Sequence, residues 1–425
     1  MSKQPFIETL GAKVDIISGF AFPSEFFNQD AGLPLVRIRD LGTDSPEVLY
    51  NGEYDEIYKV HNGDLLIGMD GDFEVHKWNG GDALLNQRVC KVVSTSKDLD
   101  QHFLYWYLKP IILKIHSKTP QTTVRHLSVK NINLIEIPKF SHQEQGVVAR
   151  ILDTLDTTIR ETEAIIAKLK AVKQGLLHDL LTRGLDDNGE LRPPQSEAPH
   201  MYKQSPLGWI PVGWEARALG EVCSLIRDGT HLPPVRVADG PLLLSVRNMQ
   251  DGQFILTDQD TRVSESFYIQ MHKSWDVRKG DVLLAIVGAT IGKTVIVGDM
   301  PKFTLQRSVA VLRGKLDKLL NPFLHLYIGS PEFQLLLWAQ VNQTAQPGIY
   351  LDQLGGLTVS VPNSAEQAAI HQKLQAAQVR IDEESDLTLK LRKLKSGLMG
   401  DLLTGRVRVT PLLNDPPGPS PEAAP

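Results

Sequence analysis

The chain has 425 residues, of which 42% are hydrophobic and 22% charged, and at roughly 100–200 residues per domain this length allows about two to four domains. Its net charge of −5 excludes a globally basic protein, although a local basic patch can still bind nucleic acid. Two cysteines exclude a disulfide framework, and the absence of a long apolar run or signal-peptide core leads us to expect a cytoplasmic protein.

Residues 1–140 are predicted to form a mixed α/β globule. Short alternating or apolar runs punctuated by Gly, Asn and Asp over residues 34–93 are typical of strands and turns, and a helix is expected at about 102–116. Residues 141–184 then predict one long helix. The polar, proline-containing stretch 185–205 is predicted to be a linker.

The second half of the chain is predicted to repeat this order. Residues 206–362 read as another mixed α/β globule, with strand-like runs over 241–313 and a helical stretch over 322–340. Residues 363–408 predict the second long helix. The proline-rich tail, 409–425, cannot pack a core and is expected to be disordered.

The repeat is visible in the sequence itself. Lys168–Thr182 (KLKAVKQGLLHDLLT) and Lys390–Thr404 (KLRKLKSGLMGDLLT) share nine of fifteen residues at an offset of 222. Weaker matches at nearby offsets extend toward the front of each copy. They pair Gln87-Arg88 with Gln306-Arg307 and Asn62–Leu66 with Lys279–Leu283, whereas Glu144-Gln145 matches Glu366-Gln367 at the same offset of 222. The rear of each copy is therefore similar, whereas the front has diverged.

Each long helix carries apolar or small residues at alternating steps of three and four, which is typical of a coiled-coil seam. The predicted seam positions are Val148, Leu152, Leu155, Ile159, Thr162, Ile166, Leu169, Val172, Leu176 and Leu180, and then Ile370, Leu374, Ala377, Ile381, Glu384, Thr388, Leu391, Leu394, Leu398 and Leu402. Ser141 and Ser364 are predicted N-caps, and Gly184 and Gly405 are predicted C-terminal caps.

We therefore expect an α+β fold with a pseudo-two-fold internal repeat. Two mixed α/β domains are separated by two helices of about 40 residues, about 60 Å long, which form an intramolecular antiparallel coiled coil. The alternative is a pair of ordinary core helices, which average only about 11–12 residues.

Gly288–Thr294 (GATIGKT) is the segment that comes nearest to a catalytic motif, the phosphate-binding P-loop. A P-loop needs four residues between its first two glycines, and only three separate Gly288 from Gly292. The readings left open are a strand–turn–strand element, a DNA-facing loop and a nucleotide site. No amino-methyltransferase motif is credible, because Asn321-Pro322-Phe323 lacks one proline and Asp415-Pro416-Pro417 is followed by Gly418. No residues show metal-ligand spacing.

Three motifs carry a resemblance to a known family over about residues 8–408. They are WIPVGWEARALGEV at Trp209–Val222, DGTH with a nearby proline at Asp228–Pro233, and the run from Tyr350 through VSVP and EQ to GLMGDLLTGR. The last is the most specific because it occurs twice. On these motifs the chain resembles the specificity (S) subunit of Type I restriction–modification systems.

The resemblance implies a subunit that does no chemistry. Two target-recognition domains would read a bipartite, asymmetric site in double-stranded DNA. The long helices would dock two methyltransferase (M) subunits, which use S-adenosylmethionine, and through them restriction (R) subunits, which use ATP and Mg. The alternatives are the recognition subunit of a related system with fused methyltransferase–nuclease partners, a P-loop NTPase and a pure coiled-coil scaffold.

Arg, Asn and Gln side chains make bidentate contacts to base edges, while Lys mostly meets phosphate. On this basis the DNA-contact candidates in the first globule are Arg37, Arg39, Asn86, Gln87, Arg88, Lys118, Gln121, Thr122, Thr123, Arg125 and His126. Those in the second are Thr230, His231, Arg247, Asn248, Thr290, Lys293, Gln306, Arg307, Gln343 and Gln346. The loops that do not recur, 118–125 and 342–347, are favoured for sequence choice. The recurring Gln-Arg pairs leave open a shared structural role.

A shared docking partner would explain why the rear of each copy stayed similar. The docking candidates on the exposed helix faces are Glu144, Gln145, Asp179, Thr182, Glu366, Gln367, Asp401 and Thr404. For Asp179 and Asp401, local hydrogen bonding at the helix end is the alternative.

Overall fold

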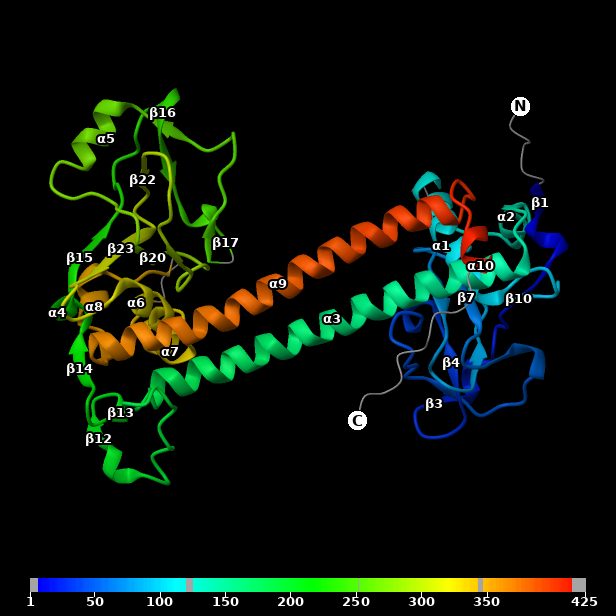
Figure 1. Cartoon of the computed structure of the whole chain (residues 1–425), viewed down its shortest axis with the longest axis horizontal. Coiled ribbons are helices and arrows are strands. Elements are labelled where there is room, and N and C mark those ends of the chain that lie inside the picture. Colours follow the sequence, from blue (N-terminus) through cyan, green and yellow to red (C-terminus); the bar gives the residue numbers. More distant parts are fainter. Residues whose placement is uncertain (1–6, 120–124, 251, 343–346, 415–425) are drawn as a thin grey trace. The chain divides into compact units, whose positions relative to one another are not determined.

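The computed structural model describes residues 7–119, 125–250, 252–342 and 347–414, and it divides into two compact units (Figure 1). Unit 1 consists of residues 1–164 and 386–425, and unit 2 consists of residues 165–385. Each unit therefore combines one globule with one end of each long helix, α3 (His142–Thr182) and α9 (Ser364–Leu402). Among the described helices, none is long and apolar enough to cross a membrane.

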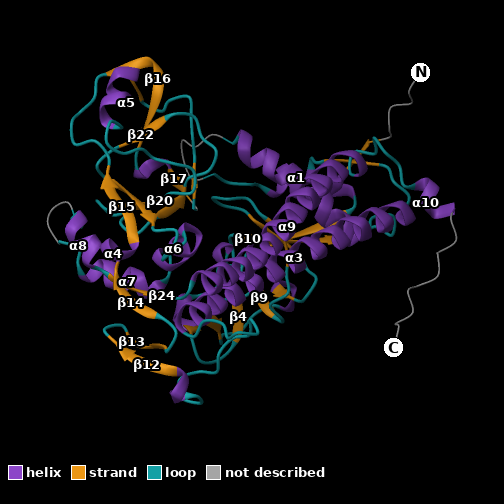
Figure 2. Cartoon of the chain, turned by 60° about the vertical axis from the view of Figure 1, so that its left-hand side comes forward, coloured by secondary structure: helices purple, strands orange, loops and turns teal. Residues whose placement is uncertain are grey.

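Unit 1 is built on two larger sheets and one short pair of strands (Figure 2). One sheet has the order β2-β10-β7-β8, the other β3-β5-β4-β9-β6, in which β4 and β9 run parallel, and β1 pairs with β11. The strands are β1 (Ile7–Thr9), β2 (Val14–Ser18), β3 (Phe27–Asn28), β4 (Leu33–Val36), β5 (Leu49–Tyr50), β6 (Lys59–Val60), β7 (Leu65–Gly68), β8 (Val75–Lys77), β9 (Ala83–Leu85), β10 (Val89–Ser94) and β11 (Glu136–Pro138). The helices are α1 (Gln101–Lys118), α2 (Val129–Asn133) and α10 (Thr410–Asn414), with short 3-10 turns at Leu10–Ala12, Ser24–Phe26, Ile38–Asp40 and Glu56–Tyr58.

Unit 2 repeats the four-stranded sheet, the parallel strand pair and the strand pair that ends at the long helix, but its second sheet has three strands and it has two further strand pairs. Its sheets have the orders β15-β23-β20-β21 and β19-β16-β22, with β16 and β22 parallel, and strand pairs β14-β24, β12-β13 and β17-β18. The strands are β12 (Tyr202–Ser205), β13 (Gly208–Pro211), β14 (Glu215–Ala218), β15 (Cys223–Asp228), β16 (Arg236–Leu244), β17 (Met249–Gln250), β18 (Gln253–Phe254), β19 (Arg262–Val263), β20 (Val282–Ala285), β21 (Thr294–Ile296), β22 (Phe303–Leu305), β23 (Val309–Gly314) and β24 (Thr358–Val361). The helices are α4 (Leu219–Val222), α5 (Glu265–Met271), α6 (Asn321–Ile328), α7 (Pro331–Ala339) and α8 (Leu351–Gly356), with 3-10 turns at Pro199–Met201 and Val246–Asn248.

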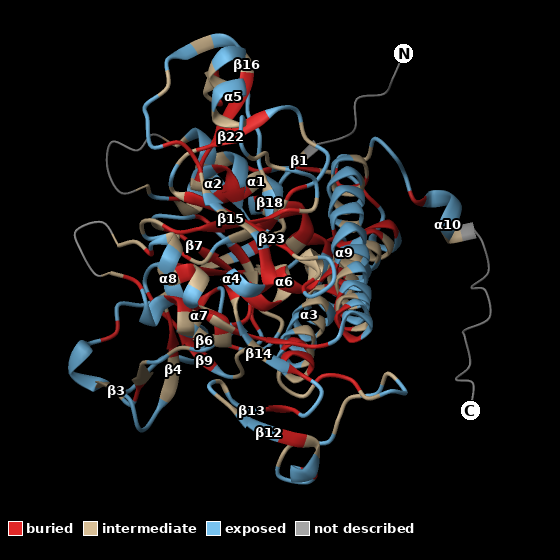
Figure 3. Cartoon of the chain, turned by 90° about the vertical axis from the view of Figure 1, so that its left-hand side faces the viewer, coloured by how far each residue is buried: buried red, intermediate tan, exposed pale blue. Residues whose placement is uncertain are grey.

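The central strands explain why the sequence shows apolar runs rather than strict alternation. All four residues of β7 and all four of β20 are buried, because each strand is covered on both faces. Figure 3 colours buried residues red. The α+β class with two repeated globules and long helices is confirmed.

The two units share one strand register, which can be followed through glycines in matching turns. Gly63 and Gly280, 217 residues apart, have φ of 93° and 87°, and their N–H groups donate to the carbonyls of Trp78 and Val297. Only glycine adopts this backbone region without strain. The predicted match of Asn62–Leu66 with Lys279–Leu283 is therefore confirmed.

The predicted match of Gln87-Arg88 with Gln306-Arg307 is wrong by one residue. The parallel pairing of β4 with β9 joins Val36 to Leu85, and that of β16 with β22 joins Leu244 to Leu305, so Leu85 and Leu305 are equivalent. This makes the local offset 220, not 219. Gln87 is therefore the structural equivalent of Arg307.

The long helices pack antiparallel within each unit, but the predicted seam is wrong at two positions. Val172 and Leu394 face outward, with exposed fractions of 59% and 51%. The next residues, Lys173 and Lys395, point inward instead. A straight helix has 3.6 residues per turn and drifts from a 3.5-residue repeat, which shifts the seam by one residue. Glu384 and Thr388 both make further contacts in the structure.

The inward lysines make equivalent cross-helix contacts in the two units. Lys173 Nζ donates to Gln378 Oε1 at 2.5 Å in unit 2, and Lys395 pairs with Asp156 in unit 1. Both partners and both lysines are 222 residues apart. The repeat therefore extends to polar contacts inside the seam.

The helix caps were predicted correctly except at one residue. Ser141 and Glu144 form a reciprocal capping box, with backbone-to-side-chain distances of 3.2 and 3.0 Å. Gly184 and Gly405 have φ of 65° and 71°, as their C-terminal positions require. At the start of α9, however, Asn363 and not Ser364 is the N-cap, because its Oδ1 accepts from the N–H of Glu366 at 2.9 Å.

Three other segments differ from the predicted elements. The segment predicted as a linker contains a 3-10 turn and strand β12, whose hairpin with β13 crosses the predicted boundary at 205/206. The helical stretch expected over 322–340 is two helices, because Pro331 cannot continue α6 and Ser330 caps α7. The tail expected to be disordered from residue 409 begins with α10, and residues 415–425 lie outside the described part of the chain.

Candidate nucleic-acid interface and docking surface

In unit 1 the ends of β2, β4, β7 and β9 and the start of β10 meet around one β-turn, Asn86–Val89. The N–H of Val89 donates to the carbonyl of Asn86 at 2.9 Å and closes the turn. Neighbouring strands fix it from both sides, because Asn86 N–H donates to Val36 O at 3.2 Å and Met69 N–H donates to Arg88 O at 2.9 Å. We call this turn with its flanking loops the strand-end surface of unit 1.

Unit 2 has an equivalent strand-end surface around the turn Gln306–Val309. Val309 N–H donates to Gln306 O at 3.0 Å, and Gln306 N–H donates to Leu244 O at 2.9 Å. Ile286 N–H donates to Ser308 O at 2.9 Å, as Met69 does to Arg88 in unit 1. The same rigid turn therefore presents side chains in both units.

Several predicted DNA-contact residues of unit 1 gather on its strand-end surface. Arg39, Gln87 and Arg88 are exposed. Arg88 Nε lies 3.5 Å from Asp70 Oδ2, and Asp70 Oδ1 lies 2.6 Å from His126 Nδ1. These contacts bring the β7–β8 loop, the turn and the segment after α1 together.

The remaining described candidates of unit 1 differ in how free they are. Lys118 is exposed at the end of α1. Arg125 lies 2.6 Å from the ring of His116 and is half-buried. The prediction that Arg37 contacts DNA is corrected, because its Nε lies 3.2 Å from the buried carboxylate of Asp40 and helps close the 3-10 turn. It is used inside the fold.

In unit 2, the prediction that Thr230 and Asn248 contact DNA is corrected, because both residues are buried. Thr230 Oγ1 donates to Leu232 O at 3.0 Å, and Asn248 Nδ2 donates to Asp260 Oδ1 at 2.8 Å. Their polar atoms shape loops and are unavailable to a base. Asn86 of unit 1 is likewise buried.

Two of the exposed candidates of unit 2 line a cleft of about 570 Å³. His231 and Arg307 both line it, together with the exposed ring of Tyr350. His231 Nε2 lies 2.7 Å from Asp228 Oδ2, which orients the ring. Arg247 is exposed, and Gln306 is half-buried.

The GATIGKT segment forms the hairpin between β20 and β21. Gly288 and Gly292 have φ of 85° and 93°, and the chain enters a strand after the loop. A P-loop requires a helix there, whose N-terminal amides hold phosphate. The strand–turn–strand prediction is confirmed, and the P-loop alternative is wrong because no helix follows the loop. Thr290 is half-buried and Lys293 exposed, next to the strand-end surface.

Five predicted contact residues cannot be placed. Gln121, Thr122, Thr123, Gln343 and Gln346 lie outside the described residues. Among the residues that the structure describes, no group of three or more His, Cys, Asp or Glu side chains could hold a metal ion.

Gln145 and Gln367 are corrections to the predicted docking surface, because both are buried. Gln145 Nε2 donates to the carbonyls of Asp98 and Phe140 at 2.7 and 3.2 Å, and its Oε1 accepts from Asp100 N–H at 2.8 Å. Gln367 repeats this pattern with the carbonyls and N–H of Lys318, Pro362 and Leu320, at 2.7, 2.8 and 2.8 Å. Each glutamine fixes the start of a long helix to its own globule.

The prediction that Glu144 and Glu366 lie on the exposed docking surface is also corrected. Glu144 accepts hydrogen bonds from Arg408 at 2.6 Å and from Thr410 at 2.8 Å. Burial alone would raise the pKa of Glu144, but the Arg408 guanidinium and the donors of Ser141 and Thr410 lower it to about 2. Glu366 accepts from Arg192 at 2.5 Å and from the N–H of Leu185 at 2.8 Å. Each glutamate holds the chain that leaves the opposite helix.

The other four docking candidates remain at the surface. Asp179 Oδ1 lies 3.1 Å from Arg183 Nη1, and Asp401 pairs with Arg406. Thr182 and Thr404 donate to the carbonyls four residues earlier, at 2.7 and 2.6 Å. Local helix-end bonding is therefore present at all four, but their side chains stay partly accessible.

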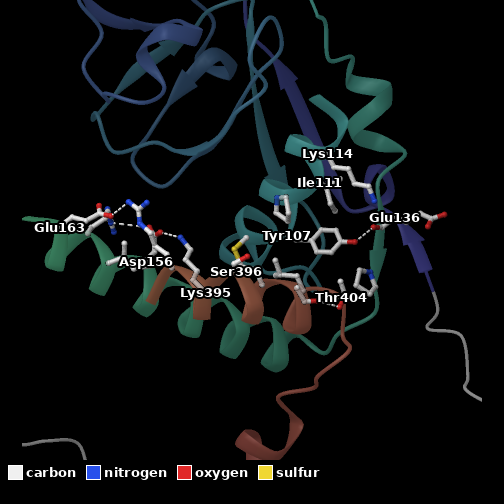
Figure 4. A pocket seen from close by; sticks show the side chains of 17 residues that line it. Tyr107, Ile111, Lys114, Glu136, Asp156, Glu163, Lys395, Ser396 and Thr404 are labelled. Atoms are coloured by element: carbon white, nitrogen blue, oxygen red, sulfur yellow. Dashed lines mark hydrogen bonds and ion pairs between the residues drawn. The ribbon is translucent and has the colours of Figure 1, made fainter. Parts of the chain in front are cut away.

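A largely apolar groove of about 900 Å³ lies in unit 1 between α1, α3 and α9 (Figure 4). Tyr107 and Ile111 of α1 line one wall, and Ser396 of α9 and Thr404, just after the end of α9, line the other. Ion pairs Asp156–Lys395 and Glu163–Arg392 border one end. Of the predicted docking residues only Thr404 lines this groove, because the groove is formed by helices from separate parts of the chain.

Comparison with known proteins identifies the family. The model of the "Type I restriction modification DNA specificity domain" matches residues 10–171 and 211–391. The chain belongs to this family. The two matched ranges fall on the two copies of the repeat, and the family confirms the resemblance drawn from the repeated motifs.

Curated relatives of this Type I specificity family cover most of the chain. The specificity subunit of the Type I restriction enzyme EcoBI from Escherichia coli is 31% identical over 375 residues, which are 86% of this chain and 78% of that one. The specificity subunit of MjaVIII from Methanocaldococcus jannaschii is 26% identical over 356 residues, 82% of this chain and 80% of its own.

Solved structures share the fold of this specificity chain. The S subunit of a Type I system from M. genitalium has a TM-score of 0.56 at 14% identity, covering 94% of this chain and 96% of its own. A chain from a structure of complex assembly and conformational transition in the Type I system has a TM-score of 0.57 at 16% identity, covering 95% and 98%.

Proposed function

We propose that the chain is the DNA-reading subunit of a Type I restriction–modification complex, with each strand-end surface reading one half of a bipartite, asymmetric DNA site. The observation that carries this proposal is that the same β-turn, held by backbone hydrogen bonds to neighbouring strands, occurs once in each unit with different exposed side chains. A repeated scaffold with unlike readers is what recognition of two unlike half-sites requires. Membership of the specificity family supports it.

The proposal assigns the chemistry to partner subunits. M subunits, two per chain, transfer the methyl group of S-adenosylmethionine, and R subunits use ATP and Mg for cleavage. The specificity chain binds DNA and these subunits and has no catalytic residue of its own. The related arrangement, with methyltransferase and nuclease fused in one partner, is distinguished by which protein co-purifies with the chain.

Methylome sequencing tests the DNA-reading role. A host that carries this chain together with its M subunit should show methylation at one motif made of two specified parts and an unspecified spacer. A host with the M subunit alone should not. Methylation at a single uninterrupted motif, or equal methylation without this chain, would contradict the proposal.

We further propose that the apolar groove of unit 1 receives an M subunit. Its walls are mostly apolar while its end is ringed by charges, which suits an amphipathic protein segment. The exposed Leu389 lies seven residues before Ser396, two turns away on the same face of α9, and extends the apolar surface that a partner could cover.

Ser396 provides a test of this docking surface. It is exposed on α9 and lines the groove, so Ser396→Arg should fill the groove without disturbing the core. We expect at least a severalfold loss of co-purified M subunit. The matched control is Ser117→Arg on the exposed end of α1, outside the groove. Equal M recovery for both variants would exclude the groove as the docking site.

A further inference from the structure

We propose that Gln87 and Arg307 are specificity-determining residues that make the two half-sites different, Gln87 reading an adenine and Arg307 a guanine. The inference rests on the proposed function, and it deepens it by naming which position of the shared scaffold is the reader. Sequence comparison of the two copies hides this position, because it pairs Gln87 with Gln306.

The strand register makes the two residues equivalent. Leu85 ends β9 and pairs with Val36 of the parallel strand β4. Leu305 ends β22 and pairs with Leu244 of the parallel strand β16. Two residues later, Gln87 and Arg307 each occupy the second position of a β-turn closed by an i to i+3 hydrogen bond. One scaffold position therefore carries Gln in unit 1 and Arg in unit 2.

The turn geometry leaves this position as the one that projects. The first turn residue is less accessible, because Asn86 is buried and Gln306 is half-buried, and their backbones bridge Phe20 and Thr230. At the third position Arg88 leans toward Asp70 at 3.5 Å. Gln87 and Arg307 are exposed, and within the described part of the chain no hydrogen bond or ion pair holds either side chain.

A rigid backbone with a free side chain suits base reading. The turn is anchored by backbone bonds to three neighbouring strands, so a side chain at its second position is presented at a fixed place. Gln pairs with N6 and N7 of adenine, and Arg pairs with O6 and N7 of guanine. The difference between the two units is thus the difference between two bases.

The other equivalent pair of exposed side chains does not account for asymmetry. Arg39 and Arg247 follow β4 and β16 at matching places in the 3-10 turns Ile38–Asp40 and Val246–Asn248. Because both are arginine, they provide the same contact in both units, whether to phosphate or to base. Of these two equivalent positions, only the one occupied by Gln87 and Arg307 carries side chains that pair with different bases.

Exchanging the two side chains tests the inference in the M-bound complex. In Gln87→Arg, methylome sequencing should show one A·T position of one half-site changed to G·C or relaxed, with the other half-site intact. In Arg307→Gln, one G·C position of the other half-site should change to A·T or relax. If methylation in a host becomes too weak to map, binding to duplexes with each base pair at each motif position replaces it. Discrimination should then fall about 5- to 140-fold at one position only.

The controls are exposed residues of the same types placed elsewhere. Gln143→Arg lies at the start of α3, and Arg217→Gln lies in β14, and both should leave the motif unchanged. An unchanged motif in either exchange variant, a change in both half-sites, or uniform weakening at all positions would overturn the inference. A wild-type motif that is not bipartite would instead overturn the proposed function, so the two failures are distinguishable.

Discussion

Gln145 and Gln367 show why the rear of each copy stayed similar. Both are buried, and both use the whole amide to tie the first turn of a long helix to the loop before α1 or α6. The similarity of these residues was read from the sequence as a shared partner surface. The structure instead gives a shared internal attachment, which sequence alone cannot separate from docking, because both preserve the same side chains.

Replacing either glutamine by alanine should destabilise its own unit. In Gln145→Ala the N–H of Asp100 and the carbonyls of Asp98 and Phe140 lose their buried partner, at a cost of about 1–3 kcal/mol. Urea unfolding followed by circular dichroism measures the loss, and Gln367→Ala should behave alike. The exposed Gln143→Ala should change stability by less than about 0.5 kcal/mol. Equal effects of Gln143→Ala and Gln145→Ala would refute this role.

Glu144 makes the stability of unit 1 depend on acid pH. Its pKa is lowered to about 2 in the folded chain, so the unfolded chain binds the proton more tightly. The resulting stability, at most about 3 kcal/mol, is present above the unfolded pKa of about 4.5 and is lost as the pH falls toward 2.

The comparison of wild type with Glu144→Gln over this pH range measures the effect. The variant should be less stable at pH 7, and the difference should shrink steadily between about pH 4.5 and 2. Gln145→Ala is the internal control, because an amide does not titrate and its cost should persist. A Glu144→Gln deficit that stays constant with pH would show that the carboxylate charge is unimportant.

At the scale of elements, the existence of the long helices was predictable but the phase of their seam was not. The repeating apolar residues indicate a coiled coil, yet a step of three or four at each turn depends on how the helix drifts against its partner. Val172 and Lys173 are adjacent, and apolarity alone favours the valine. The lysine points inward because Gln378 provides an acceptor, a contact made across more than 200 residues of sequence.

The front globules were predictable as strand-rich domains but not in register. Connections of different length change the offset between copies from 217 at β7 and β20 to 220 at β9 and β22. The repeated Gln-Arg letters therefore suggested the wrong pairing. The burial of Thr230 and Asn248 was equally hidden, because short polar residues that shape loops look the same in a sequence as residues that touch DNA.

The β20–β21 hairpin requires glycine at position 292. Its φ of 93° strains any residue with a side chain, and a Cβ there would also lie 2.0 Å from Gln334 Oε1, the movable end of a flexible side chain. We expect Gly292→Ala to cost about 1–3 kcal/mol in thermal or urea unfolding. Gly298→Ala, with no atom within 4 Å of its Cβ, is the matched control. A Gly292→Ala variant as stable as Gly298→Ala would contradict the observed hairpin packing.

At the scale of the whole molecule, the chain combines unlike strand-end surfaces with like attachments of the long helices. The strand-end surfaces differ at Gln87 and Arg307, whereas the attachments repeat Gln145 as Gln367 and Glu144 as Glu366. At these positions, the residues that differ between the copies are exposed, and the residues that repeat are buried. Half-site sequence and the spacer between half-sites should therefore change independently of each other.

Lengthening both helices tests the spacer directly. Four residues inserted after Ala164 and four before Asp386, where α3 and α9 pass from one unit to the other, leave the Glu163–Arg392 pair intact. They add about 6 Å and close to one full helical turn to each helix. Methylome sequencing should show the same half-site bases with a spacer about two base pairs longer. Two-residue insertions at the same places add only about half a turn and should abolish methylation. Altered half-site bases with an unchanged spacer would show that the helices do not set the spacing.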